Sequence, residues 1–136
     1  CVNAGGDLAH RGRSPWPVAI ENPLRPYDNE PPVARLTLQN QGLATSGRSR
    51  RGVRVAGEHS SHVIDPRTGA TVDHLASVSV VAPDAMTADV LATVVGCLSA
   101  TEVVERVEPM ADVGVLVIDR DGRQSCDSTW RTLSEA

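Results

Sequence analysis

Lysine and phenylalanine are both absent from the 136 residues of this chain, so every basic side chain is an arginine. Aromatic residues of all kinds make up only 2% of the sequence. The joint absence is typical of GC-rich codon usage, although arginine also suits bidentate contacts with phosphate. Without phenylalanine, we expect an aliphatic core built from Val, Leu, Ile and Ala.

The chain also lacks a long apolar run, a paired-cysteine motif and an excess of positive charge. No stretch approaches the ~20 apolar residues that a membrane span requires. Cys1, Cys97 and Cys126 form neither a CxxC pair nor a zinc-ligand spacing, and we interpret Cys97 as a small buried apolar residue. The net charge of −4 argues against a general nucleic-acid surface. The length suits one domain with a modest core.

Hydrophobic periodicity predicts an α+β fold: a mixed, largely antiparallel sheet with helices packed on one face. In the first half of the chain, four short segments read as strands: 16–21, 33–39, 43–46 and 52–55. A hairpin-like break at 40–42 predicts that the third of these pairs with the second. The polar residues 9–15, which include His10, predict a solvated loop.

The second half of the chain opens with a strand pattern. Valine and serine alternate along residues 75–81, which predicts a half-buried strand. Residues 113–119 form the clearest buried-strand pattern and end in a turn at 120–122. We interpret 126–133 as a last edge strand.

A helix is predicted over residues 84–99, with either Asp84 or Thr87 suited to cap its start. Four of its apolar side chains recur at helical spacing and are expected to face the core: Leu91, Val94, Val95 and Leu98. Gly96 lies inside the pattern and weakens it by about 1 kcal/mol relative to alanine. A second short helix is predicted at 101–107.

Residues 62–69, with the sequence HVIDPRTG, are the segment on which the functional argument depends. The β-branched residues after the histidine predict a short strand, and the acid, proline and glycine that follow favour a tight turn. A strand that ends in such a turn holds His62 and Arg67 near one rim. Taken alone, the same pattern is also typical of a surface β-turn without chemistry.

Five segments together resemble the C-terminal part of the ApbE-like flavin transferases, in order and in spacing. They are NAGGD at 3–7, ATSG at 44–47, HVIDPRTG at 62–69, ASVSVVAP at 76–83 and ADVLAT at 88–93. The resemblance extends to about Gly122. It implies that residues 1–136 are the C-terminal portion of a single ApbE-like domain. Because the chain has neither an initiator Met nor a signal peptide, we expect it to be a fragment of a larger protein.

The resemblance implies an enzyme that transfers FMN from FAD to a threonine or serine hydroxyl of an acceptor protein and releases AMP. It also implies Mg²⁺ as a cofactor, because the family residues that match Asp89 and Thr93 hold that ion. On the residues alone, a carboxylate and a hydroxyl four positions apart share one face of a helix and suit Mg²⁺. Two ligands do not make a site, and this spacing usually means a solvated helix face.

His62 matches the family histidine proposed as the catalytic base, and a pKa near neutrality fits that task. Its alternative is a structural histidine at a strand end. The resemblance implies the following flavin-binding residues: Gly5, Gly6, Asp7, Thr45, Ser46, His62, Val63 and Arg67. The sequence leaves structural alternatives open for these as well. The glycines suit an ordinary turn, the hydroxyls suit backbone caps, and Val63 suits the core.

Ser49 stands where the family commonly carries a tyrosine, which removes one ring contact. Two other functions therefore stay open: Mg²⁺-dependent hydrolysis of FAD to FMN and AMP, and a non-catalytic flavin-binding or structural role. We expect the fragment to be inactive alone and to self-associate through uncovered apolar surface. The expected parent is bacterial, either membrane-associated or extracytoplasmic, or else cytoplasmic.

Overall fold

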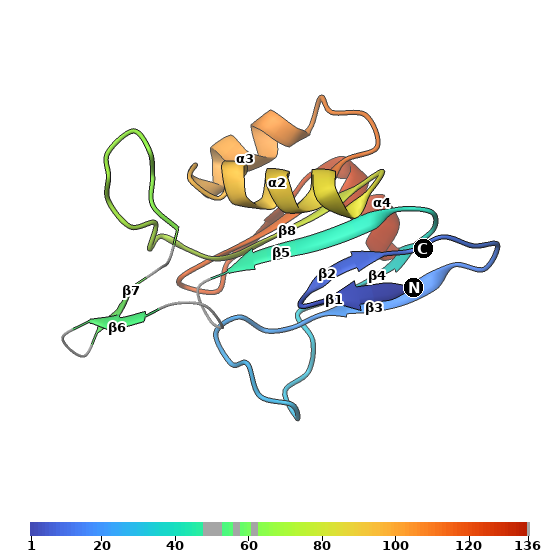
Figure 1. The fold of residues 1–136 in the computed structure, drawn as a ribbon, viewed down its shortest axis with the longest axis horizontal. Coiled ribbons are helices and arrows are strands. Elements are labelled where there is room, and N and C mark those ends of the chain that lie inside the picture. Colours follow the sequence, from blue (N-terminus) through green and yellow to red (C-terminus); the bar gives the residue numbers. More distant parts are fainter. Residues whose placement is uncertain (48–52, 56–57, 61–62, 136) are drawn as a thin grey trace.

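A computed structural model describes residues 1–47, 53–55, 58–60 and 63–135, so Ser49 and His62 lie outside the described residues. Its centre is a six-stranded sheet in which every pairing is antiparallel (Figure 1). In spatial order its strands are β1 (Val2–Ala4), β2 (Asp7–Ala9), β5 (Gly42–Gly47), β8 (Leu75–Ala82), β9 (Gly114–Asp119) and β10 (Gln124–Cys126). Two strand pairs stand outside this sheet: β3 (Trp16–Ile20) with β4 (Ala34–Leu38), and β6 (Val53–Val55) with β7 (Glu58–Ser60).

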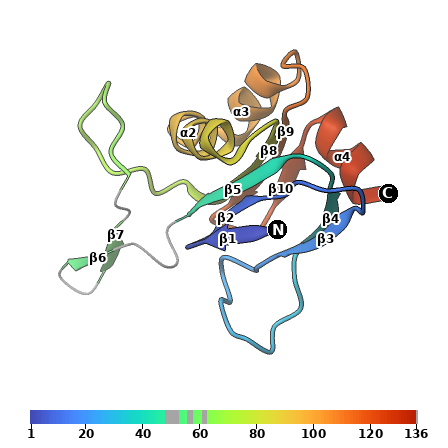
Figure 2. The same ribbon diagram turned by 45° about the vertical axis from the view of Figure 1, so that its right-hand side comes forward.

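Helices α2 (Ala85–Val95) and α3 (Ala100–Val107) cover one face of the sheet (Figure 2). Small and β-branched side chains make this core. Val78 and Val80 of β8 meet Ala88 and Ala92 of α2, and all four are essentially inaccessible to solvent. Alanines on the inner face let the helix approach the strands closely, which compensates for the lack of aromatic side chains.

The opposite face is covered by the β3–β4 pair and by α4 (Ser128–Glu135). Trp130 of α4 is only 2% exposed and packs with Leu38, Leu116 and Ile118. Two expectations need correction here. Helices lie on both faces of the sheet, and the core is aliphatic except for this tryptophan. The α+β class itself is confirmed.

Strand β8 is buried at every position, whereas the valine–serine alternation predicted a half-buried strand. The prediction was wrong because both faces of this central strand are covered, by α2 on one side and by the second core on the other. The serines are therefore buried polar residues: Ser77 and Ser79 are 4% and 1% exposed.

Strand β5 does not return as the partner of β4, contrary to the prediction from the break at 40–42. It pairs with β2 and β8, while β4 pairs with β3. The break is real, since Asn40 has a φ of 58°, but it carries the chain from one sheet to another. Gly42 then lies directly under the start of α2, because a Cβ at this position would overlap the backbone of Ala85.

The start of α2 is capped by Asp84, whose carboxylate accepts the Thr87 N–H at 2.9 Å and the Thr87 hydroxyl at 2.9 Å. These hydrogen bonds lower the pKa of Asp84. The helix ends at Val95, with Gly96 as its C-cap, rather than continuing to residue 99. Its buried face also differs from the prediction, because Val94 is 61% exposed. The predicted second helix is present and begins with a capping box between Ser99 and Glu102.

The interpretation of 126–133 as an edge strand was wrong. Only residues up to Cys126 are in β10, and α4 follows. Asp127 causes the change, because its buried carboxylate accepts the N–H groups of Thr129 at 3.2 Å and Trp130 at 3.1 Å. The same carboxylate accepts the Val115 N–H at 2.8 Å, which fastens the helix start to β9.

Two smaller predictions also fail. His10 is only 3% exposed, and its Nδ1 accepts the Asn40 N–H at 3.2 Å, so it is not part of a solvated loop. Cys97 is partly exposed rather than buried. Within the part of the chain that the structure describes, no helix is long and apolar enough to cross a bilayer.

Candidate functional site

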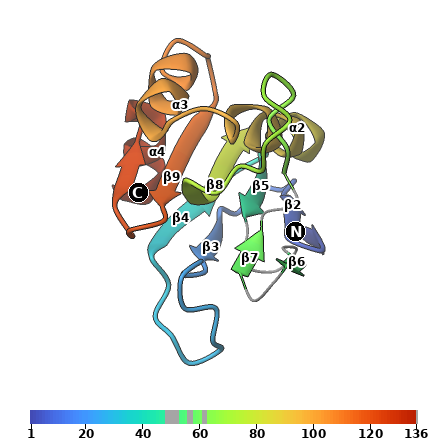
Figure 3. The same cartoon turned by 90° about the vertical axis from the view of Figure 1, so that its left-hand side faces the viewer.

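A cavity of about 610 Å³ lies where the β1–β2 turn, β3, β5 and α2 come together. Seven of the residues predicted from the sequence line it: Gly5, Gly6, Asp7, Thr45, Ser46, Asp89 and Thr93. They come from three segments far apart in the chain, and Figure 3 shows the elements that bring these segments together. The structure therefore gathers most of the predicted site into one place.

The glycine turn between β1 and β2 forms one wall of the cavity. Gly5 and Gly6 have φ values of 74° and 112°, which side-chain-bearing residues rarely adopt. The Asn3 side chain accepts the Gly6 N–H at 3.0 Å and holds the turn in this shape. The turn thus presents bare backbone to the cavity, followed by the carboxylate of Asp7.

Strand β5 supplies the floor of the cavity through Thr45 and Ser46. The hydroxyls of Thr45 and Ser79, which face each other across β5 and β8, are 2.8 Å apart. From the sequence, the Thr45 hydroxyl was expected either to bind the flavin or to cap a backbone group. The hydrogen bond with Ser79 is neither of these. The hydroxyl is already partnered within the sheet, yet the residue remains exposed towards the cavity.

Helix α2 contributes Asp89 and Thr93 from one face, and both are exposed. Within the described residues that were searched, no group of three or more His, Cys, Asp or Glu side chains is placed to hold a metal. Two oxygen donors still suit Mg²⁺, which keeps several waters and shares phosphate oxygens with its substrate. Asp89 and Thr93 thus fit one side of a magnesium shell.

The charge of the described cavity lining is entirely negative. Asp7, Glu21 and Asp89 line it, and none of the lining residues within the described part of the chain is Arg, Lys or His. A phosphate ester that enters this cavity alone would meet repulsion from the carboxylates of Asp7 and Asp89. A cation bound beside Asp89 would reverse that interaction, so the electrostatics favour joint binding of a metal and a phosphate.

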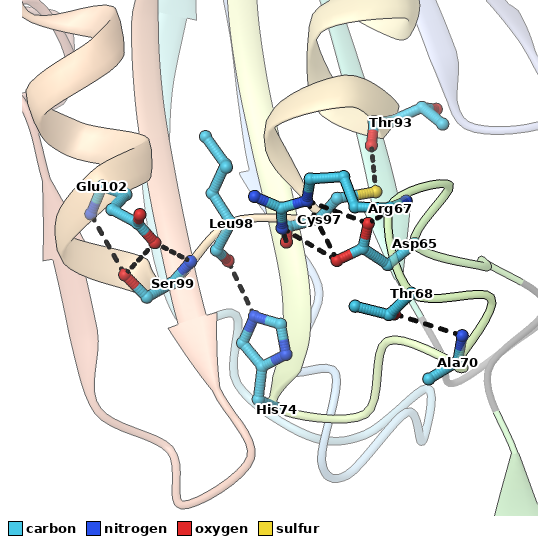
Figure 4. A network of polar contacts seen from close by, with 10 residues as sticks. All are labelled: Asp65, Arg67, Thr68, Ala70, His74, Thr93, Cys97, Leu98, Ser99 and Glu102. Atoms are coloured by element: carbon cyan, nitrogen blue, oxygen red, sulfur yellow. Dashed lines mark hydrogen bonds and ion pairs between the residues drawn. The ribbon is translucent and has the colours of Figure 1, made fainter.

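Arg67 does not line this cavity, and its side chain makes hydrogen bonds elsewhere (Figure 4). Its Nε and Nη2 donate to the two oxygens of Asp65, at 3.0 and 2.8 Å, and Nη2 also donates to the Cys97 carbonyl at 3.1 Å. The Arg67 contacts lower the pKa of Asp65, while the Asp65 carboxylate raises the pKa of Arg67. Flavin binding by Arg67 remains a prediction; its visible contacts hold the turn.

The turn itself is as predicted, but the strand before it is not. The Gly69 N–H donates to the Asp65 carbonyl at 2.8 Å, and Gly69 has a φ of 70°. Ile64 forms only an isolated bridge with Thr71. His74, at the far end of this loop, bonds the Leu98 carbonyl through Nε2 at 2.7 Å (Figure 4).

Val63 lines a second, smaller cavity of about 20 Å³. Ser46, Gly47 and Ser77 border both cavities. The predicted base, His62, lies outside the described residues, so its role stays a prediction.

Several lining residues were not predicted from the sequence, and for one of them, Ser77, the sequence contained a signal. Val18, Ile20 and Leu43 add an apolar wall, and Ser77 adds a buried hydroxyl. A serine at alternating positions of a very apolar strand indicates a polar contact within the protein, and this pattern was interpreted only as solvent exposure.

Comparisons with known proteins give the family to which this chain is similar. The family model described as "ApbE family" matches residues 1–117. The FAD:protein FMN transferase of Salmonella typhimurium is 42% identical over 114 residues, covering 77% of this chain and 32% of that protein. The Escherichia coli K12 protein of the same name is 39% identical over 130 residues, covering 89% of the chain and 35% of that protein.

Solved structures show the same likeness. The ApbE protein of Thermotoga maritima superposes with a TM-score of 0.83 at 27% identity, covering 97% of this chain and 43% of that one. The flavin transferase ApbE of Vibrio cholerae gives a TM-score of 0.74 at 30% identity, with 96% and 42% covered. The chain spans about a third of the length of the curated relatives it matches.

Proposed function

The chain belongs to the ApbE family, and from this premise we propose that its protein transfers FMN from FAD to a threonine or serine hydroxyl of an acceptor protein. The name shared by the curated relatives supports FAD as the flavin donor and a protein as the acceptor. The observation on this chain that carries the proposal is the single cavity that joins the glycine turn, Thr45 and Ser46 with Asp89 and Thr93.

The proposed step is a substitution at phosphorus. The acceptor hydroxyl oxygen attacks the FMN phosphorus of FAD, and a new P–O bond forms. The bond from that phosphorus to the bridging oxygen breaks, and its electron pair leaves with AMP. The hydroxyl proton passes to a base, a role that the family resemblance assigns to His62.

A magnesium ion held by the Asp89 carboxylate and the Thr93 hydroxyl would neutralise charge on the pyrophosphate. The wholly acidic charge of the described cavity lining supports this requirement, because the lining residues offer no cationic side chain to do the same. The backbone of the turn at Gly5 and Gly6 allows close approach of the nucleotide. The apolar side chains of Val18, Ile20 and Leu43 suit an aromatic ring.

The test uses the full-length gene product that contains this chain, incubated with FAD, Mg²⁺ and a threonine-bearing acceptor protein. In-gel flavin fluorescence on the acceptor is the expected result. Free FMN and AMP without labelled acceptor would instead indicate hydrolysis of FAD. Bound FAD without turnover would indicate a flavin-binding role. Either of these two results would overturn the proposal.

A matched pair of variants links the activity to the cavity. Asp89→Asn removes the lining carboxylate of α2 and is expected to abolish the Mg²⁺-dependent labelling. Glu105→Gln removes an exposed carboxylate of α3 that does not line the cavity, and labelling should be unchanged. Residues 1–136 alone are expected to give no labelling.

We also propose that residues 1–136, produced alone, self-associate. Met86, Val90 and Val94 are 76%, 54% and 61% exposed and follow one another at four-residue spacing along α2. Residues at this spacing form a continuous stripe on a helix, and an apolar stripe in water favours association.

A further inference from the structure

Ser77 carries a buried hydroxyl without a hydrogen-bond partner among the described residues, and it borders the candidate cavity. The residue is 4% exposed, and its oxygen is almost completely covered. Buried hydroxyls in proteins are nearly always hydrogen-bonded, so an unpartnered one lining a cavity indicates a partner that the described residues do not supply. It is the only buried side-chain oxygen or nitrogen in this state within the described part of the chain.

The neighbouring serine shows why the partner is missing. Ser79 lies opposite Thr45 in the β5–β8 pairing, and their hydroxyls are 2.8 Å apart. Two residues along the same strands, Ser77 lies opposite Gly47. Side chains that face each other in an antiparallel pair interact directly, but a glycine has none to offer. Ser79 therefore has a hydrogen-bonding side chain opposite it on β5, whereas Ser77 does not.

Gly47 also leaves little room for any other residue. A Cβ at this position would lie 3.1 Å from the Ala76 carbonyl oxygen and 3.3 Å from the Ser77 Cβ. These distances are tighter than most Cβ contacts, so an alanine at position 47 would require its neighbours to shift by a few tenths of an ångström and would narrow the space beside Ser77. The absence of a side chain at position 47 keeps this space open towards both cavities.

The surroundings indicate what enters this space. Apolar side chains of Val18, Ile20 and Leu43 line the cavity, and among the described lining residues the charged ones are all acidic. A phosphate is disfavoured by such a lining unless a metal accompanies it. An uncharged heteroaromatic ring with nitrogen or carbonyl groups on its edge fits better, because its faces suit apolar walls and its edge can bond a hydroxyl.

We propose that the Ser77 hydroxyl turns about its Cα–Cβ bond into the gap beside Gly47 and hydrogen-bonds the edge of a heteroaromatic ring of the nucleotide. The staggered positions of a serine hydroxyl make this turn a local change of one side chain. The proposal rests on the proposed function, because it takes the ligand to be FAD. Both the flavin and the adenine of FAD have the required chemistry, and the test distinguishes them.

The experiment measures affinities of the full-length gene product for FAD, FMN and AMP by calorimetry, together with the melting temperature without ligand. In Ser77→Ala, a lost hydrogen bond is expected to weaken FAD binding about three- to tenfold. The same loss of affinity should appear for only one of FMN and AMP. A loss for FMN identifies the flavin as the bonded ring, and a loss for AMP identifies the adenine. The melting temperature without ligand should stay equal or rise, because an unpartnered buried hydroxyl is removed.

Ser79→Ala is the matched control for stability, since it removes a hydroxyl that is already bonded within the protein. Its melting temperature without ligand should fall. Gly47→Ala should weaken the same ligand as Ser77→Ala, and the double variant should show less than the sum of the two losses, because both act on one contact.

Two results would overturn the proposal. The first is an unchanged affinity of Ser77→Ala for all three ligands while the wild-type protein binds FAD, which leaves the proposed function intact. The second is a fall in the Ser77→Ala melting temperature as large as that of Ser79→Ala, which would show that a buried water in the smaller cavity already satisfies the hydroxyl. Absence of FAD binding by the wild-type protein would instead overturn the proposed function itself, and this inference with it.

Discussion

The guanidinium of Arg67 donates hydrogen bonds to both carboxylate oxygens of Asp65, through Nε and Nη2. Its Nη2 also donates to the carbonyl of Cys97, just beyond the end of α2. These contacts tie the turn at 65–69 to the helix that carries Asp89 and Thr93. His74 adds a second tie through the Leu98 carbonyl. The resulting network connects the loop at 65–74 with the C-terminal end of α2, next to Thr93 (Figure 4).

Arg67→Ala is therefore expected to loosen the turn locally. Hydrogen exchange should accelerate at the Gly69 and Val72 amides, whose carbonyl partners lie within the loop, and stay unchanged in β8 and β9. Arg67→Lys should restore only part of the protection, since lysine cannot form the two-pronged contact with Asp65. Equal exchange in all three proteins would contradict the structural role. A loss of FAD affinity in Arg67→Ala with unchanged exchange would instead favour direct flavin binding.

Asp127→Ala is expected to be strongly destabilising. The side chain is fully buried and accepts three backbone N–H groups, from Val115, Thr129 and Trp130. Each buried donor left without an acceptor costs about 1–3 kcal/mol, so a loss of several kcal/mol in the free energy of unfolding should appear in urea denaturation. Glu105→Ala, at an exposed position of α3, should change this free energy by less than about 0.5 kcal/mol. Similar values for both variants would refute the assignment.

Stability should fall when the solution is acidified. The pKa values of Asp65, Asp84, Glu102 and Glu108 are all lowered in the folded protein by hydrogen bonds that the carboxylates accept. A group with a lowered folded pKa stabilises the fold above its unfolded pKa and loses this contribution as the pH falls through the folded value. The loss should begin near the ordinary values of 3.8 for Asp and 4.5 for Glu and continue below them.

Glu102→Gln tests this dependence, because glutamine retains the capping geometry at Ser99 but does not titrate. Denaturation series between pH 7 and pH 3 should give a shallower acid slope for the variant than for the wild type. Identical slopes would show that Glu102 does not contribute.

Self-association of residues 1–136 is expected to depend on the stripe formed by Met86, Val90 and Val94. Light scattering coupled to size exclusion should give a mass above 14.4 kDa that rises with concentration. Replacing all three residues by glutamine should return the mass to that of the monomer. A monomeric wild-type chain at every concentration, or a variant that associates as strongly, would refute the role of this stripe.

Most of the fold could be predicted from the sequence, since local signals are strong there, whereas the roles of the candidate site residues stay predictions. Asp84 was one of the two residues expected to cap α2, and the buried strand predicted at 113–119 is present as Gly114–Asp119. Seven of the predicted site residues line one cavity. Motifs with turn glycines and helical spacing constrain local geometry, and this chain follows those constraints.

The wrong predictions concern strand pairing and strand burial, which depend on how the sheet and the elements that cover it pack together. No local signal indicates that β5 pairs with β8, because these strands are separated by the whole segment 48–74. Burial of β8 on both faces involves a second core, to which the β3–β4 pair and α4 contribute, and residues of α4 were predicted to form a strand. The tryptophan and threonines of that segment favour strands, but the cap from Asp127 and the burial of Trp130 outweigh this preference.

The most direct test of the central claim is a crystal structure of the full-length gene product with FAD and Mn²⁺, which stands in for Mg²⁺ and is located by its anomalous scattering. We expect the dinucleotide in the cavity between the glycine turn and α2, with the metal peak bonded to the Asp89 carboxylate and the Thr93 hydroxyl. Bound FAD elsewhere, with Asp89 and Thr93 facing only water, would contradict the account.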